Sequence, residues 1–183
     1  MFSLQDAVES FSKDITRWLS DANILLKLPK DSDREDPGWV TPKVYKGGLP
    51  IRISGLDEVS FANFYPAIVV KLSGGEVHSE DAWTSMQIDV GTWDNDASMS
   101  GYSDVLTLVQ FLYEKILAEN IIHKTYRARL PVKYTVEPPE KTFPFFEACI
   151  TLGIDFPAVW PRGISLGGDA LYPFANVRSV DDQ

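Results

Sequence analysis

Three aspartates gather within eight positions of this 183-residue chain, at Asp89, Asp94 and Asp96. Neighbouring carboxylates can transfer protons or bind Mg²⁺ or Ca²⁺. The tripeptide Asp-Asn-Asp that starts at Asp94 is similar to the start of a calcium-binding loop, which also needs glycine at its sixth position and glutamate at its twelfth. Met99 and Val105 occupy those two positions here. We therefore interpret the aspartates as a solvated acidic loop, and we predict no metal and no cofactor.

Few other side chains of this sequence are suited to catalysis. Cys149 is its one cysteine, which excludes an internal disulfide and a cysteine-based metal site. It stands between Glu147 and Thr151 on the charged side of an expected strand, and we interpret it as a half-buried structural thiol. His78 and His123 lack partners at metal-binding spacing and are expected to be surface or capping residues. The sequence has no Walker, dinucleotide-binding, zinc-binding or nucleophile-elbow motif, so we predict that the protein is not an enzyme.

The charges of the chain are unevenly distributed. Lys and Arg number 17 against 26 Asp and Glu, which gives a net charge of -9 and disfavours binding to nucleic acids or anionic membranes. The segment from Leu72 to Glu114 has no Lys or Arg and contains eight acids, namely Glu76, Glu80, Asp81, Asp89, Asp94, Asp96, Asp104 and Glu114. The segment from Ile121 to Val136 has no acid and contains four bases, namely Lys124, Arg127, Arg129 and Lys133.

Two interpretations of this segregation are open. The acidic and basic segments can be neighbours across the sheet of one subunit. Alternatively, the acidic face of one subunit meets the basic face of the next, and head-to-tail contacts of this kind close into rings. The second interpretation predicts a subunit interface formed by Arg127, Arg129, Lys133, Asp89, Asp94 and Asp96.

Apolar spacing predicts two helices. The first begins near Ser3, and its apolar residues recur every three or four positions on one face, at Leu4, Val8, Phe11, Ile15 and Trp18. The second spans about 102–118, and Asn120 suits its C-terminal end.

Alternation of apolar and polar residues predicts strands at 68–72 and 86–90 and two longer strands at 126–136 and 146–156. A proline-rich loop joins the last two, which favours an antiparallel pair. Pro131 cannot donate to a ladder, so an edge or a bulge is expected there. We predict an α+β fold, with an antiparallel or mixed sheet of about four to five strands and two helices packed on one face. The expected order is helix-strand-strand-helix-strand-strand.

These elements predict one α+β domain over residues 1–156, with a loop-rich insertion at 29–64 and a C-terminal extension at 157–183. A short strand is expected near 51–53 within the insertion. The sequence begins without the features of a signal peptide, and no stretch reaches the roughly 18 apolar residues of a membrane span. We therefore expect a soluble protein that is cytoplasmic when it is made.

Short motifs follow one another in a distinctive order between residues 65 and 157. They are Tyr65-Pro66-Ala67-Ile68-Val69-Val70, Gly91-Thr92-Trp93-Asp94, Gly101-Tyr102-Ser103-Asp104-Val105-Leu106, Leu130-Pro131-Val132 and Pro144-Phe145-Phe146-Glu147. In this order they resemble the tail terminator (tail completion) proteins of long-tailed bacteriophages and prophages. The resemblance covers about half of the chain, and none of the motifs is catalytic.

The resemblance implies a small α/β fold that assembles as a ring, typically a hexamer. In that family the ring sits on the last tail-tube ring, stops tube polymerisation and presents a surface to the head connector. The implied partners are copies of the chain itself, the major tail tube protein and the head-tail connector protein, with no membrane and no sequence-specific nucleic acid. The implied location is the host bacterial cytoplasm during assembly and then the virion tail. An acidic lumen would let DNA pass through the ring without binding.

Two alternatives to a tail terminator stay open. One is another phage head-tail connector, neck or baseplate component with a similar fold. The other is a metal-binding regulatory protein or an enzyme that uses the carboxylates of Asp89 to Asp96.

Overall fold

The structure is a computed structural model, and it describes residues 3–28, 38–49, 62–77, 82–95 and 98–155. The strand expected near 51–53 and the expected extension at 157–183 lie outside these ranges. The chain begins with helix α1 (Leu4–Asp21), which has a capping box at its start. The Ser3 hydroxyl oxygen accepts a hydrogen bond from the backbone N–H of Asp6 (3.0 Å), and the Asp6 carboxylate accepts one from the Ser3 N–H (3.0 Å).

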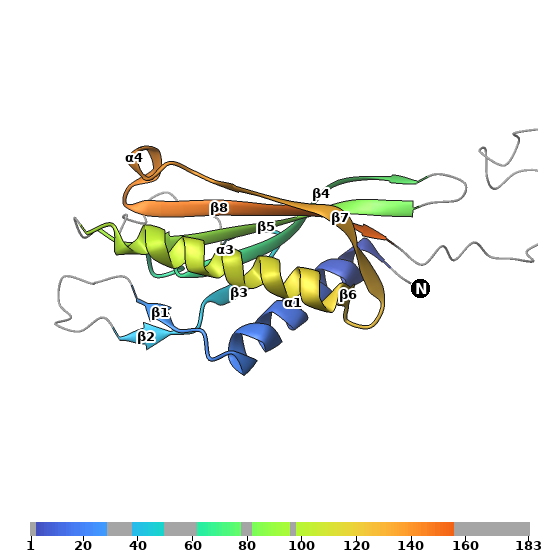
Figure 1. The fold of residues 1–183 in the computed structure, drawn as a ribbon, viewed down its shortest axis with the longest axis horizontal. Coiled ribbons are helices and arrows are strands. Elements are labelled where there is room, and N and C mark those ends of the chain that lie inside the picture. Colours follow the sequence, from blue (N-terminus) through green and yellow to red (C-terminus); the bar gives the residue numbers. More distant parts are fainter. Residues whose placement is uncertain (1–2, 29–37, 50–61, 78–81, 96–97, 156–183) are drawn as a thin grey trace, which may run out of the picture.

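Six strands form one mixed sheet in the order β3-β4-β5-β8-β7-β6 (Figure 1). Their bounds are β3 Lys43–Lys46, β4 Ala67–Val77, β5 Ala82–Trp93, β6 Ile121–Ile122, β7 Tyr126–Val136 and β8 Phe145–Asp155. Strand β3 is parallel to β4, and the other neighbouring pairs are antiparallel. A separate two-stranded sheet pairs β1 (Leu26–Lys27) with β2 (Trp39–Val40).

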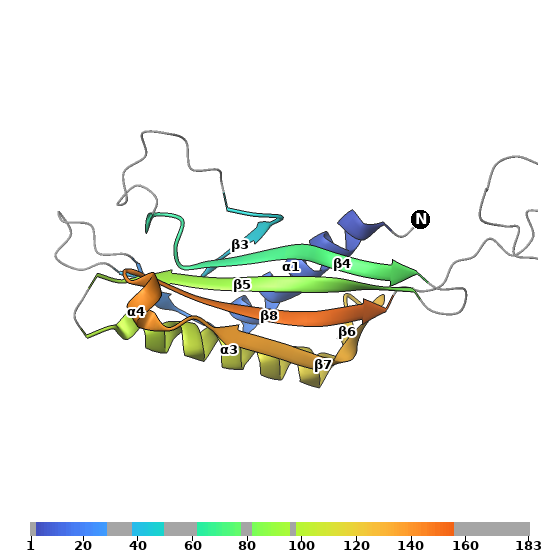
Figure 2. The same ribbon diagram turned by 90° about the horizontal axis from the view of Figure 1, so that it is seen from above.

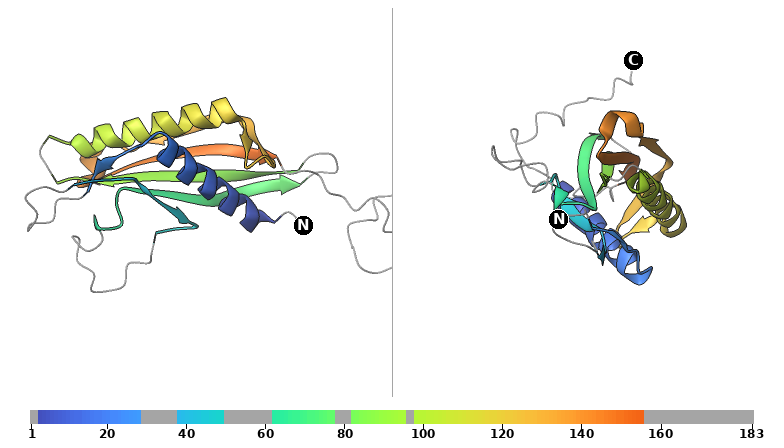
Figure 3. Two further views of the ribbon diagram at one scale, coloured as in Figure 1. Left: turned by 90° about the horizontal axis from the view of Figure 1, so that it is seen from below. Right: turned by 90° about the vertical axis from the view of Figure 1, so that its left-hand side faces the viewer.

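Both long helices cover the same face of the curled six-stranded sheet (Figures 2 and 3). Helix α1 contacts β3 and β4, and helix α3 (Ser100–Glu119) contacts β5, β8 and β7. Alternate residues of the strands point to these helices and form the core, which includes Ile68, Val70, Met86, Ile88, Val90, Phe146, Ile150, Leu152 and Ile154. The remaining alternate residues lie on the other face of the sheet, which neither α1 nor α3 covers. We call this the open face.

Several predictions about individual elements are confirmed. Strands β7 and β8 are antiparallel, and their register shifts between Arg129 and Lys133, next to Pro131. Among the described residues, strand β6 pairs only with the first residues of β7, and no described strand pairs with that edge of β7 around Pro131. Asn120 ends helix α3 in the left-handed conformation, with φ of 50°.

The predicted numbers of elements are wrong. The described residues contain six strands in the main sheet, two more in a second sheet, and three helices, instead of four to five strands and two helices. The missed strands β1, β2, β3 and β6 have two to four residues each, which is too short for an alternating pattern to be recognised. The missed helix α4 (Pro139–Thr142) is one turn between β7 and β8. The class is α+β, with a more complex sheet than expected.

In the described part of the chain, no helix combines the length and the apolar character that are needed to cross a membrane.

Candidate functional site

The six residues of the predicted subunit interface do not form one cluster. Arg127 and Lys133 are exposed on β7, where their register with Asp155 and Thr151 places them on the open face. Asp96 lies outside the described residues. The other three members have partners within the same chain, and these partners explain their positions.

Arg129 and Asp89 are held by neighbours across the open face. The Arg129 Nε forms an ion pair with the Asp155 carboxylate (2.8 Å), and its guanidinium lies 5.6 Å from the centre of the Trp83 ring. Asp89 forms an ion pair with Lys71 and accepts a hydrogen bond from the Gln87 amide (2.7 Å). Arg129 and Asp89 therefore each have an oppositely charged partner inside one subunit. These partners, Asp155 and Lys71, differ from the pairing of Arg129 with Asp89 that the charge pattern suggested.

Asp94 serves the start of helix α3. Its carboxylate oxygen accepts hydrogen bonds from the Ser100 hydroxyl (2.5 Å) and from the Gly101 N–H (3.1 Å). The N-cap residue of the helix is Met99, which is left-handed (φ 52°) and offers no side-chain cap, so a carboxylate from the preceding loop takes this role. Asp94 is roughly 16 Å along the chain from Asp89, so the two do not form a paired carboxylate site.

Replacing Asp94 with alanine is expected to lower the free energy of unfolding by about 1 kcal/mol, because the Gly101 N–H in the first turn of α3 and the Ser100 hydroxyl lose their acceptor. Chemical denaturation followed by circular dichroism measures the loss. Asn95→Ala is the matched control, because Asn95 is the exposed neighbour. Equal losses for the two variants would contradict the capping role.

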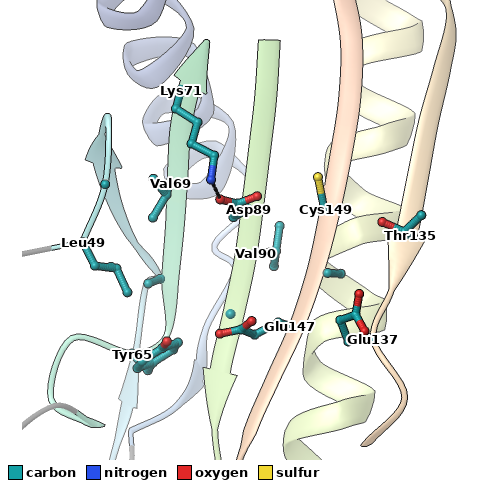
Figure 4. Close-up of a pocket in the computed structure, with 14 residues that line it drawn as sticks. Leu49, Tyr65, Val69, Lys71, Asp89, Val90, Thr135, Glu137, Glu147 and Cys149 are labelled. Atoms are coloured by element: carbon teal, nitrogen blue, oxygen red, sulfur yellow. Dashed lines mark ion pairs between the residues drawn. The ribbon is translucent and has the colours of Figure 1, made fainter. Parts of the chain in front are cut away.

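A groove of about 360 Å³ lies on the open face, across strands β4, β5, β8 and the end of β7 (Figure 4). Leu49 and Tyr65 border it on one side, and Glu137 borders it on the other. We call it the acidic groove, and its polar lining includes Tyr65, Lys71, Asp89, Glu137, Glu147 and Cys149.

One end of the acidic groove is built by Tyr65 and Gly91. The buried Tyr65 ring lies against β5 so closely that a Cβ on Gly91 would be 2.6 Å from its Cε1 atom. The same ring contacts the Phe145 ring, with centroids 5.3 Å apart. Glycine at position 91 is therefore needed for the close approach of the Tyr65 ring to β5. Tyr65 also belongs to a small second hydrophobic core that includes Trp93.

The acidic groove has an excess of negative charge. Burial, followed by the nearby carboxylates of Asp89 and Glu137, raises the pKa of Glu147, although its side chain reaches solvent. Lys71 and a hydrogen bond from the Tyr65 hydroxyl oppose this rise. Burial raises the pKa of Tyr65, so its hydroxyl keeps its proton and donates. Three carboxylates thus share one described cation, Lys71.

Replacing Glu147 with glutamine is expected to stabilise the isolated chain at pH 7. A carboxyl whose pKa is raised on folding favours the folded state when it is protonated, so its stability contribution is lost as pH rises through the folded pKa. The amide keeps an acceptor for Tyr65 but carries no charge. The gain in melting temperature should disappear as pH falls to about 4.5, where the unfolded carboxyl also protonates. Thermal unfolding from pH 4 to 8 tests this, with exposed Glu140→Gln as control. A gain that persists at low pH would contradict the assigned cause.

The described residues offer little for metal or nucleophilic chemistry. They contain no group of three or more His, Cys, Asp or Glu side chains that could hold a metal ion. The Cys149 thiol lines the acidic groove, and burial raises its pKa, which disfavours the reactive thiolate. His123 is exposed, and His78 lies outside the described residues. The dispersed carboxylates of the acidic groove can attract a cationic group.

The sequence interpretation did not include Tyr65, Lys71, Glu137 or Glu147 in the candidate site. Glu147 alternates with the apolar residues of β8, so its position on the open face could be recognised from the sequence. The approach of Tyr65 to Gly91 depends on segments 26 positions apart and has no local pattern.

No model of a known protein family matches this chain, and a search of curated proteins finds no similar sequence.

Proposed function

We propose that this protein is a tail terminator of a long-tailed phage or prophage. It forms a ring that caps the end of the tail tube, stops further polymerisation and offers a joining surface to the head-tail connector. The proposal rests on the ordered motifs between residues 65 and 157, which resemble that family. It includes assembly in the host cytoplasm and a final place in the virion tail.

One observation supports the proposal most strongly: three of the motifs meet at one end of the sheet. The Thr92 hydroxyl donates to the Gly101 carbonyl (2.7 Å), and the Asp94 N–H donates to the Pro144 carbonyl (3.0 Å). Gly101 lies against Phe146, where an added Cβ would be 2.7 Å from the ring. The motifs therefore stabilise the packing of β5, α3 and β8. This role is expected of motifs that proteins share because they have the same fold, rather than the same catalytic activity.

The open face supplies the second support. A ring needs each copy to present two different surfaces that fit each other. The described residues of the open face include an acidic groove at one end and exposed bases on β7, which is the asymmetry that head-to-tail contact uses.

The direct test is growth of tail tubes from the tube protein encoded in the same genome. Adding the purified protein should stop tube growth, and electron microscopy should show a ring at one tube end. Pull-down with the tube protein and with the connector protein separates the alternatives. Binding to the connector alone, with unchanged tube growth, would favour another head-tail component. Heat on titration with Ca²⁺ or Mg²⁺, without tube binding, would favour a metal-dependent regulator.

A further inference from the structure

The open face is divided by charge. The acidic groove occupies the end where Glu137, Glu147 and Asp89 lie, and its one described cation, Lys71, is already paired with Asp89. Further along β7, on the same face, are Arg127 and Lys133. The two parts of one face therefore carry opposite charge.

Lys133 has no ion-pair partner among the residues that the structure describes, and its side chain is exposed. The same is true of Arg127, whereas Arg129 is paired with Asp155. Lys133 and Glu137 are four residues apart on an extended chain, which is roughly 13 Å, so they do not satisfy each other directly. The exposed ammonium group of Lys133 is therefore available to a carboxylate of another molecule.

The acidic groove suits an organic cation better than a metal ion. Its carboxylates come from β5, β8 and the end of β7, and they are too dispersed for a metal-binding group among the described residues. A lysine side chain can place its apolar stem along Val69 and Leu49, which line the groove, and its ammonium group near the carboxylates. Burial, followed by the carboxylates of Asp89 and Glu137, raises the pKa of Glu147, so a cation placed beside it would stabilise its charged form.

We propose that the occupant of the acidic groove is a second copy of this chain, which inserts Lys133 of its β7 between Glu137 and Glu147. The contact pairs two unlike parts of the surface of one copy, the groove and Lys133, as head-to-tail assembly into a ring requires. In this contact the acidic side of the interface is formed by Glu137 and Glu147, instead of by Asp89, Asp94 and Asp96 as the sequence suggested. This inference rests on the proposed function for its assembly state, and it assigns the residues that make the contact.

The test uses charge reversal in the full-length chain. Lys133→Glu and Glu137→Lys each place like charges in the contact, so each should weaken self-association at least about tenfold, as measured by sedimentation velocity. The chain that carries both substitutions restores opposite charges and should associate within a few-fold of the natural chain. Lys141→Glu and Glu140→Lys on α4 are matched controls with the same changes in net charge and should have no effect. Circular dichroism checks that every variant is folded.

Two results would overturn the inference: single reversals that behave like their controls, or a double variant that is no better than the single ones. If the natural chain is monomeric in solution, the same five variants are compared in the tube-growth experiment. There, single reversals should fail to stop growth and the double variant should recover. Unchanged activity of the single variants overturns this contact and leaves the proposed function intact. A natural chain that neither self-associates nor stops tube growth rejects both.

Discussion

Replacing Phe146 with alanine is expected to lower the free energy of unfolding by about 3–5 kcal/mol, the largest effect that we expect from a single substitution. Phe146 is fully buried on β8, where its ring faces helix α3. Its centroid lies 6.4 Å from that of Tyr102 and 6.2 Å from that of Phe143. Gly101 lies directly against the ring and has no side chain that could fill the space. Truncation therefore leaves a cavity between β8 and α3.

Phe143→Ala is the matched control for this substitution. The two rings contact each other, but Phe143 is 47% exposed, so its removal leaves no enclosed cavity and should cost well under half as much. Urea denaturation followed by tryptophan fluorescence gives both free energies. Similar losses for the two variants would mean that β8 does not pack on α3 as the structure has it.

The long strands and helices were predictable because each repeats its pattern many times. Strands β7 and β8 have 11 residues each, enough for several cycles of alternation, and helix α1 shows its apolar face over five turns. Even there, one end differs from the prediction: Leu4 is 54% exposed, because the first turn of α1 extends beyond the core. Local chemistry also sufficed at Asn120, where a left-handed residue was needed to end α3.

The parallel pairing of β3 with β4 could not be predicted in the same way. Strand β3 has four residues, Lys43–Lys46, and its position depends on pairing with β4 some 24 residues later. Short strands owe their existence to such partners rather than to their own alternation. The sheet therefore had more strands than the sequence pattern indicated.

The charge pattern predicted the exposed bases of β7 but not the acidic groove, because Glu137 and Glu147 lie outside both charged segments. It marked β7 as basic, and Arg127 and Lys133 are exposed there. It also marked Asp94, whose carboxylate caps α3, a role that depends on how the loop before the helix folds back. Charge segregation along a sequence is a property of segments, whereas pairing is decided by atoms from several segments.

Replacing Asp14 with alanine is expected to cost about 2 kcal/mol, the second-largest effect. Asp14 is a buried carboxylate on α1, and its oxygen accepts a hydrogen bond from the backbone N–H of His123 (2.5 Å). A second oxygen lies 3.4 Å from the Arg17 guanidinium. His123 and Lys124 are both left-handed, with φ of 49° and 58°, so the turn before β7 exposes an N–H that needs an acceptor.

The controls for Asp14 separate the hydrogen bond from the charge. Asp14→Asn keeps an oxygen acceptor and should lose less than the alanine variant, while Asp21→Ala at the exposed end of α1 should have little effect. Chemical denaturation measures the stabilities, and hydrogen exchange of the His123 amide reports on the bond itself. An unchanged exchange rate in Asp14→Ala would contradict the assigned partner.

Asp14 also helps to distinguish folding from assembly. It joins α1 to a turn 109 residues away, on the side of the sheet opposite the acidic groove and Lys133. Its replacement should therefore lower stability without changing self-association at temperatures where the chain stays folded. Lys133→Glu should do the reverse, because Lys133 is exposed and the substitution removes no described contact within the subunit. If both variants lost stability and association together, the contact between copies would be coupled to the fold of β7, and charge pairing alone could not account for the ring.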